Sequence, residues 1–305
     1  MTRVATLLRL MVANELLWAL GIAAWLATSR GWPVAAAAAV GIATPLAAHA
    51  AIVGWNFVVA SVAGSPTPPE HRLGPWRAAL LYLREVIDSI VVFQWAQPWL
   101  ASRPLAGEAA TGTGRVPVLL VHGYFCNRQV WRAMARMLAG RGHPVGAVDL
   151  EPVFASIDDY VPAIERGVRE LAQRTGAAEV ALVCHSMGGL AARAYLRARG
   201  SGSIARVITL GSPHRGTAHA RLGLGRNASE MCPDSDWLAA LRAHESPETG
   251  ALFTVVLSHH DNIVSPQAHQ TIAHARTVAV SGLGHLTLAR APEIGRVVLR
   301  ALGGD

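Results

Sequence analysis

The sequence predicts an α/β fold: a mostly parallel sheet of about six strands, flanked by helices and preceded by an N-terminal transmembrane helical hairpin. From Val116 onward, short β-branched runs alternate with helical segments of ten or more residues. This alternation is typical of a parallel sheet covered on both faces. Before it, two long apolar runs fill the first 62 residues. With 51% hydrophobic and 15% charged residues, the chain is more apolar than an average soluble protein.

The charged and sulfur-containing residues exclude several classes of protein. The net charge of +7 comes entirely from arginine, because the chain has no lysine. The arginines are scattered along the sequence, which argues against a nucleic-acid-binding surface. The three cysteines, Cys126, Cys184 and Cys232, are an odd number and lack the spacing of metal ligands. We therefore expect small buried residues, with no disulfide framework and no zinc site.

The two apolar runs predict a transmembrane hairpin over residues 1–64. Leu7 to Ala27 has the length of a bilayer-spanning helix, and a second, alanine-rich run extends from Val34 to Val62. The short connector TSRGWP between them permits a tight turn. The predicted partner of this hairpin is a membrane.

A cleaved signal peptide is the alternative for the first run. Ala27-Thr28-Ser29 resembles a small-residue cleavage site, although Asn14 and Glu15 interrupt the apolar region before it. In the hairpin, antiparallel pairing brings Glu15 within one helical turn of His49. We expect these two ionisable side chains to meet and to determine the register of the hairpin.

Arginines flanking the runs predict the membrane side. Arg3 and Arg9 lie before or at the start of the hairpin, Arg72 and Arg77 follow it, and only Arg30 lies in the connector. The positive-inside bias then predicts a bacterial inner-membrane protein with both ends of the hairpin in the cytoplasm.

Residues 65–115 are expected to form an amphipathic helix and a linker. After a proline-rich break, an apolar helical pattern extends from Trp76 to Leu100, with one narrow polar stripe containing Arg84 and Asp88. Two interpretations remain open: a helix in the membrane interface, or a helix packed on the domain that follows. Residues 101–115 resemble a linker.

Residues 116–305 carry the predicted sheet. The expected strands are VPVLLVHG, HPVGAVDL, EVALVCHS, ARVITLGS, LFTVVLS and ARTVAVSG. Helices are expected over 127–140, over 158–175, after Ser186, and from Pro292 onward. Functional residues of open parallel sheets collect at the carboxyl ends of the strands. The polar residues at these ends are His122, Asp149, Ser186, Ser212, Asp261 and His285.

The third of these strands ends in a motif that favours a nucleophilic serine. The usual pattern is G-x-S-x-G, and this chain has Cys184-His185-Ser186-Met187-Gly188. A serine on this tight turn between strand and helix exposes its hydroxyl above the sheet. Cys184 replaces the first glycine, a position that must be small because strand and helix approach closely there.

A carboxylate and a histidine follow in the chain order Ser, Asp, His that this architecture requires. Asp261 follows the strand LFTVVLS. His285 follows the strand ARTVAVSG, in a loop that Gly282 and Gly284 open. His259 and His260 are rivals for the base, but next to Asp261 they lack a separate orienting acid. Structural roles are expected for the other candidate histidines: His49, His71, His143, His219, His244, His269 and His274.

Two backbone N–H groups are candidates to stabilise an oxyanion. His122-Gly123 ends the first strand, so the N–H of Tyr124 can point at the same space as that of Met187, the residue after the nucleophile.

With these motifs the chain resembles the α/β-hydrolases, and among them the small bacterial lipases. The resemblance runs from about Val116 to the C-terminus and includes VHG, HSMGG, LGSPHRGT, DNIVSP and GLGH. It implies the α/β-hydrolase fold, with Ser186 as nucleophile, Asp261 as acid and His285 as base. Tyr124 and Met187 would be the oxyanion donors. The family works without a cofactor; some members hold a structural calcium, but no clear calcium-binding pair is visible here.

The expected function is that of a serine carboxylic-ester hydrolase, a lipase or esterase that cleaves apolar acyl esters through an acyl-enzyme. Residues 214–250 are expected to form a cap or lid, with Met231, Trp237 and Leu238 available to an acyl chain. Two alternatives remain: an acyltransferase that uses the same triad, and a catalytically silent, membrane-tethered binding protein.

Overall fold

The computed structural model describes residues 2–112 and 114–303. Six parallel strands form one sheet in the order β2-β1-β3-β4-β5-β6, which confirms the predicted architecture. The strands are β1 (Val118–Val121), β2 (Val145–Val148), β3 (Val180–His185), β4 (Ile204–Leu210), β5 (Phe253–Ser258) and β6 (Arg276–Val280). The strand order reverses between β1 and β3, so loops that leave these strands diverge and create a crevice at their carboxyl ends.

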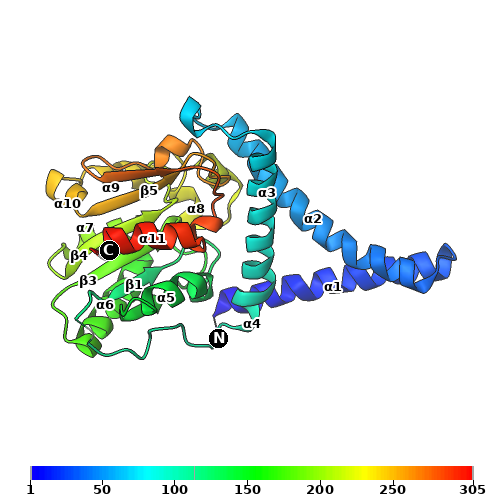
Figure 1. The fold of residues 1–305 in the computed structure, drawn as a ribbon, viewed down its shortest axis with the longest axis horizontal. Helices are drawn as coiled ribbons and strands as arrows, with labels where there is room; N and C mark the ends of the chain where they lie inside the picture. The colour runs from blue at the N-terminus through cyan, green and yellow to red at the C-terminus, as the bar shows by residue number, and fades with distance from the viewer. Residues whose placement is uncertain (1, 113, 304–305) are drawn as a thin grey trace.

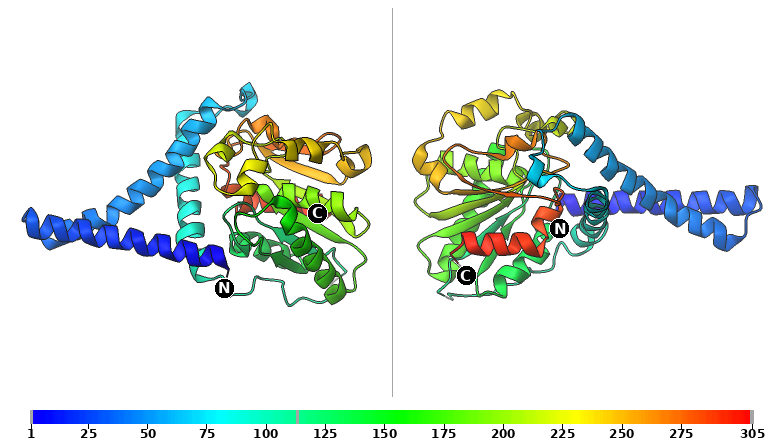
Figure 2. Two further views of the ribbon diagram at one scale, coloured as in Figure 1. Left: turned by 180° about the vertical axis from the view of Figure 1, so that it is seen from behind. Right: turned by 45° about the horizontal axis from the view of Figure 1, so that its top comes forward.

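Helices cover both faces of the sheet (Figures 1 and 2). On one face, α6 (Val161–Thr175) and α7 (Met187–Arg199) bury their apolar sides against the strands. On the other face, α5 (Arg132–Ala139) and α11 (Pro292–Ala301) do the same. The central strands are apolar without alternation because both of their faces are covered.

Short helices connect the main elements. Between β4 and β5 the chain forms η5 (Ala218–Leu222), α8 (Arg226–Glu230), α9 (Asp236–Arg242) and α10 (Pro247–Ala251). The remaining single-turn helices are η1 (Pro69–His71), η3 (Arg128–Trp131), η4 (Ile157–Tyr160), η6 (Gln267–Gln270) and η7 (Thr287–Ala289).

The first two helices form a hairpin that projects away from the sheet (Figure 1). α1 (Arg3–Ser29) and α2 (Val34–Val62) have mean hydropathies of 1.6 and 1.8 over their most apolar 18-residue windows. Both are long and apolar enough to cross a bilayer, and most of their side chains are exposed, unlike those of a core helix. They could therefore anchor the protein to a membrane. The helices meet at Gly41, where a Cβ atom would lie 2.4 Å from the carbonyl oxygen of Ala19.

The two ends of the hairpin are attached to the α/β part at separate points. The backbone N–H of Arg3 donates to the Glu151 carboxylate at 2.9 Å. Beyond the end of α2, the Ser65 N–H donates to the Gln267 side chain at 2.9 Å. The hairpin is thus splayed at its base and closed at its tip.

A third helical segment crosses the open base of the hairpin (Figures 1 and 2). It consists of α3 (Pro75–Ser89), the π-helical η2 (Ile90–Ala96) and α4 (Gln97–Trp99). It shows one of the two arrangements that the sequence left open, a helix packed on the domain that follows. One side packs on the α/β part through Arg84–Glu293 and Asp88–Arg290, at 2.6 and 2.7 Å. The other side exposes the apolar side chains of Trp76, Leu80, Leu83 and Ile87.

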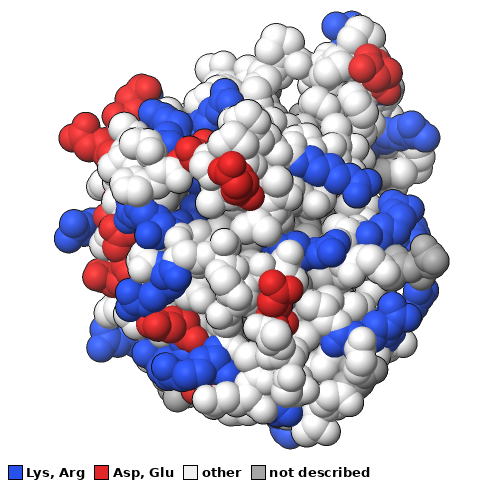
Figure 3. All heavy atoms as spheres, turned by 90° about the vertical axis from the view of Figure 1, so that its left-hand side faces the viewer, with Lys and Arg blue, Asp and Glu red and all other residues white. Residues whose placement is uncertain are grey.

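The face of the α/β part that points away from the hairpin carries charges of both signs. Arginines and acidic residues are interspersed over it (Figure 3). The charged surface and the apolar hairpin therefore lie on opposite sides of the molecule.

Candidate active site

Ser186 occupies a strained turn between β3 and α7. Its backbone has φ 56° and ψ −131°, a conformation that residues other than glycine adopt only at a cost of roughly 1–3 kcal/mol. The Ser186 N–H donates to the carbonyl oxygen of Leu210 at 3.0 Å, which fixes the turn against β4. The hydroxyl is thereby held above the sheet edge, as the motif predicts.

The turn needs small residues on both sides. At Gly188 a Cβ atom would lie 2.4 Å from the carbonyl oxygen of Val121, so α7 could not approach β1 with any other residue there. Cys184, which replaces the first glycine of the motif, is completely buried in β3. Its burial confirms that a thiol fits between the strand and its neighbours.

The loop after β1 lies directly against Ser186. A Cβ atom at Gly123 would be 2.6 Å from the Ser186 Cβ and 3.2 Å from its Oγ. Tyr124 follows in this loop, and Met187 is the first residue of α7. Both backbone N–H groups thus belong to the two segments that border the serine, and that of Met187 has no partner within its helix.

His285 and Asp261 form a buried pair at the ends of β6 and β5. The Nδ1 atom of His285 lies 2.9 Å from Oδ2 of Asp261. The other carboxylate oxygen, Oδ1, accepts from the N–H groups of Ile263 and Val264 at 2.9 and 2.7 Å. The carboxylate is therefore held rigidly and orients the imidazole.

Electrostatics in this pair favour the protonated imidazole. Burial by itself lowers the pKa of His285. The charge of Asp261, the hydrogen bond between Asp261 and His285, and the charge of Glu85 each raise it, and together they outweigh burial. The net result is a pKa above the ordinary histidine value of 6.5. This arrangement stabilises the imidazolium that forms when the imidazole of His285 takes up a proton.

The rival histidines lie elsewhere. The ring of His259 stacks 4.4 Å from that of His71, and His260 Nδ1 accepts from the Gly282 N–H at 3.2 Å. Neither ring is among the residues that line the cavity beside Ser186.

Other polar residues at the strand ends have structural contacts. His122 Nε2 accepts from the Leu150 N–H at 3.0 Å, and Asp149 forms an ion pair with Arg128 at 2.9 Å. Ser212 is completely buried next to α7.

The sequence did not single out Glu85 of α3, which supports the loop of His285. The carboxylate accepts from the N–H groups of Leu286 and Thr287 and from the Thr287 hydroxyl, at 2.8, 3.1 and 2.7 Å. Glu85 is only 3% exposed. Burial raises the pKa of Glu85, and these hydrogen bonds partly offset that increase. The available signal was an acidic residue beside Arg84 on an otherwise apolar helix.

His185 also supports this loop from within the serine motif. Its Nε2 lies 2.9 Å from the backbone carbonyl oxygen of His285, and the two rings are 4.5 Å apart. Burial lowers the pKa of His185 well below its ordinary value, so the ring is neutral and donates from Nε2.

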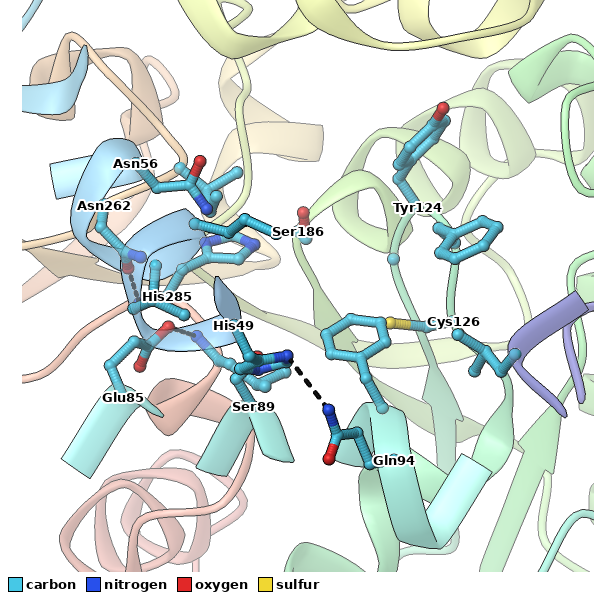
Figure 4. A pocket seen from close by; sticks show the side chains of 18 of the residues that line it. His49, Asn56, Glu85, Ser89, Gln94, Tyr124, Cys126, Ser186, Asn262 and His285 are labelled. Atoms are coloured by element: carbon cyan, nitrogen blue, oxygen red, sulfur yellow. Dashed lines mark hydrogen bonds between the residues drawn. The ribbon is translucent and has the colours of Figure 1, made fainter. Parts of the chain in front are cut away.

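Ser186 and His285 border a cavity of about 360 Å³ (Figure 4). The N-terminal helices form much of its wall, with Leu8, Met11 and Val12 from α1, Ile52 and Val53 from α2, and Ser89, Phe93 and Gln94 from α3 and η2. The expectation that Met231, Trp237 and Leu238 contact an acyl chain is not met in this cavity. Met231 and Leu238 are buried in the core beside α7, and Trp237 packs against that core.

Glu15 and His49 do approach each other, but Gln94 lies between them. The Nε2 atom of Gln94 donates to Glu15 Oε2 at 3.0 Å and lies 3.5 Å from His49 Nδ1. Among the hydrogen bonds of the described residues, none joins Glu15 to His49 directly. The expectation of direct pairing is thus corrected, because helix α3 and its η2 extension fill the space between the splayed helices.

No group of three or more His, Cys, Asp or Glu residues is arranged to hold a metal ion within residues 2–112 and 114–303.

The model of the palmitoyl protein thioesterase family matches residues 117–275, slightly more than half of the chain. This region contains Ser186 and Asp261 and ends before His285.

Two curated relatives are triacylglycerol lipases. The one from Burkholderia plantarii is 35% identical over 131 residues, 40% of this chain and 36% of the relative. The one from Pseudarthrobacter phenanthrenivorans is 36% identical over 115 residues, 35% of each. The chain thus spans about a third of the length of these relatives.

Solved structures share the fold. A mature lipase of Bacillus licheniformis aligns with a TM-score of 0.57 at 18% identity, covering 65% of this chain and 95% of that one. Lipase B of Aspergillus fumigatus aligns with a TM-score of 0.52 at 14% identity, covering 66% and 56%.

Proposed function

The chain belongs to the palmitoyl protein thioesterase family of α/β-hydrolases, and from this premise we propose that it is a serine carboxylic-ester hydrolase for apolar acyl esters. The observation that supports the proposal most strongly is the buried His285–Asp261 pair at 2.9 Å, beside a serine on a strained turn in a largely apolar cavity. The triacylglycerol lipases among its relatives favour an oxygen ester of a fatty acid as the substrate.

The proposed reaction begins at Ser186. Because Asp261 accepts from Nδ1–H of His285, the opposite nitrogen, Nε2, carries the lone pair and takes the proton of the serine hydroxyl. The serine oxygen attacks the ester carbonyl carbon, and the alkoxy group leaves with the proton from His285. Water then attacks the acyl-enzyme, His285 takes a proton from the water, and the fatty acid is released as Ser186 regains its proton.

The backbone N–H groups of Tyr124 and Met187 are the proposed donors to the oxyanion. They flank the serine on two sides, since Gly123 brings its loop into contact with Ser186 and Met187 begins α7. A donor of this kind contributes roughly 3 kcal/mol to stabilisation of the transition state.

The hairpin of α1 and α2 is the proposed membrane anchor. It would hold residues 116–305, the proposed catalytic domain, beside substrates that concentrate in lipid. Residues 214–250 are proposed to cap the domain on the side of α7 and η4, because α8 and α9 pack there.

A fluorophosphonate probe tests the proposal on the full-length protein in detergent. We expect the wild type to be labelled, and Ser186→Ala to lose both labelling and hydrolysis of a fatty-acid ester. Ser229→Ala, a change at an exposed serine, serves as the matched control and should retain both. His285→Ala should lower kcat at least about 10³-fold.

A folded wild type that resists the probe and hydrolyses no ester would contradict the proposal and favour a binding protein. Transfer of the acyl group to an added alcohol in preference to water would instead identify an acyltransferase.

A further inference from the structure

The mouth of the cavity lies between the two apolar helices. Of its lining residues, Met11 of α1 is 50% exposed and Ile52 of α2 is 63% exposed, whereas Ser186 at the inner end is only 8% exposed. Met11 lies eight residues after Arg3, which places it roughly 12 Å along α1 from the start of the helix. A bilayer around this hairpin would therefore meet the mouth near the boundary between headgroups and acyl chains.

Polar side chains from three helices form a cluster inside this mouth. His49 of α2 lies beside Ser89 and Gln94 of the α3–η2 segment (Figure 4), and Glu15 of α1 completes the cluster. The Gln94 amide nitrogen donates to Glu15 at 3.0 Å and faces His49 Nδ1 at 3.5 Å. On the other side of the imidazole, His49 Nε2 lies 2.9 Å from Ser89 Oγ. Polar groups among lipid-facing helices are costly to retain and commonly mark a functional site.

The hydrogen-bond pattern leaves two acceptors of this cluster without a protein partner. Among the described residues, no hydrogen bond reaches Oε1 of Gln94 or Oε1 of Glu15. Gln94 also lies within the π-helical η2, an irregularity frequently found at functional sites. A cluster rich in acceptors suits a ligand whose hydroxyl groups donate hydrogen bonds.

The charge of the cavity opposes an anionic ligand. No arginine of residues 2–112 and 114–303 lines it, although the chain has 27 basic residues, while Glu15 and Glu85 both do. A phosphate group would meet the Glu15 and Glu85 carboxylates and no arginine, with low-dielectric surroundings on most sides.

We propose that the cluster of Glu15, His49 and Gln94 binds the uncharged, hydroxyl-bearing part of an ester embedded in the bilayer, which reaches Ser186 between α1 and α2. This inference rests on the proposed hydrolase function and specifies its substrate class. The acyl chain would occupy the apolar wall formed by Phe93, Val53 and Leu8.

The test uses the full-length protein reconstituted in phosphatidylcholine vesicles. Three probes carry the same acyl chains: diacylglycerol, which has a free hydroxyl; the fatty-acid methyl ester, which has none; and phosphatidylglycerol, which is anionic. We expect the wild type to hydrolyse diacylglycerol with a kcat/KM at least about tenfold above that for phosphatidylglycerol. Gln94→Leu should raise KM for diacylglycerol about tenfold, the loss expected for one hydrogen bond, and leave KM for the methyl ester unchanged.

Asn14→Leu is the matched control, because Asn14 is an exposed amide on α1 outside this cavity and its loss should change neither KM. Glu15→Gln removes a negative charge from the cavity, so it should lower the ratio of kcat/KM for diacylglycerol to kcat/KM for phosphatidylglycerol. The inference is overturned if the wild type cleaves phosphatidylglycerol as well as diacylglycerol, or if Gln94→Leu alters both neutral esters equally.

Fluorophosphonate labelling of every variant distinguishes a failure of this inference from a failure of the proposed function. A labelled Gln94→Leu enzyme with an unchanged KM for diacylglycerol contradicts this inference alone. A wild type that the probe does not label contradicts the proposed function itself.

Discussion

Gly123 is the residue whose missing side chain allows the loop after β1 to contact Ser186, the proposed nucleophile. In Gly123→Ala the new Cβ would lie 2.6 Å from the Ser186 Cβ, so either the loop or the serine must move. A displacement of about 1 Å at a reacting group costs roughly 100-fold in rate. We expect kcat/KM to fall by about that factor.

Gly202→Ala is the control, because a Cβ there meets no atom within 4 Å. Equal activity of the two alanine variants would mean that the loop does not constrain Ser186.

Glu85 connects the α3 helix to the chemistry of His285. The proposed reaction needs the neutral imidazole, so we expect kcat/KM to fall as the pH drops through the pKa of His285, which lies above 6.5. The charge of Glu85 contributes to that increase in pKa. We therefore expect Glu85→Gln to move the acidic limb of the pH–rate profile to lower pH.

The same substitution should also destabilise the protein by roughly 1–3 kcal/mol, since the amide directs a donor at the donors of Leu286 and Thr287. Glu165→Gln, which alters an exposed ion pair with Arg199, should change neither quantity. A purely structural contribution of Glu85 would lower stability and leave the acidic limb in place.

At the scale of elements, the packing of α1 against α2 depends on one glycine. In Gly41→Ala the new Cβ would lie 2.4 Å from the Ala19 oxygen and 3.0 Å from the Ala23 Cβ, so the helices must separate. Such overpacking costs roughly 1–3 kcal/mol. We expect a lower midpoint of thermal unfolding, followed by circular dichroism in detergent.

Gly21 provides the matched control in the same hairpin. A Cβ at Gly21 meets no atom within 4 Å, so Gly21→Ala should gain up to about 1 kcal/mol of helix propensity without a clash. If both substitutions change the midpoint in the same direction, the two helices do not pack as the structure has them.

The third helical segment joins the hairpin to the site. The carboxylates of Glu85 and Asp88 bind the segment around Thr287 and Arg290, while Gln94 contacts Glu15 of α1. Hydrogen bonds of this segment therefore connect the hairpin with the loop that carries His285.

At the scale of the whole molecule, the arginines predict the membrane side of the α/β part. Four arginines flank the hairpin and one lies in its connector, so we expect the catalytic domain in the cytoplasm of a bacterial cell. Protease added to intact spheroplasts should leave the domain uncut, and lysed spheroplasts, as the control, should be digested.

Digestion of the domain in intact spheroplasts would instead favour export after cleavage of the first apolar segment. That alternative would remove Leu8, Met11, Val12 and Glu15 from the wall of the cavity. Mass spectrometry of the N-terminus distinguishes an intact α1 from a chain that starts after residue 29.

The sequence by itself determined the elements of the fold and predicted the candidate site residues that follow from local order along the chain. The six strands are visible because parallel strands buried on both faces are continuous apolar runs, as β1 and β3 are. The turn at Ser186 could be predicted because a serine between a strand and a helix, followed two residues later by Gly188, is the pattern of this motif. Asp261 and His285 could be chosen because the carboxyl ends of parallel strands share one edge.

Only the tertiary structure decided what surrounds these residues. Much of the wall of the cavity beside Ser186 comes from α1, α2 and the α3–η2 segment, more than a hundred positions before His285 in the chain, and not from Met231, Trp237 and Leu238. Likewise, Glu85 supports the His285 loop from 200 residues away, and Gln94 separates Glu15 from His49. The hydropathy of the sequence identifies the apolar helices. The angles at which these helices pack depend on side-chain contacts between helices, and no local sequence pattern contains those contacts.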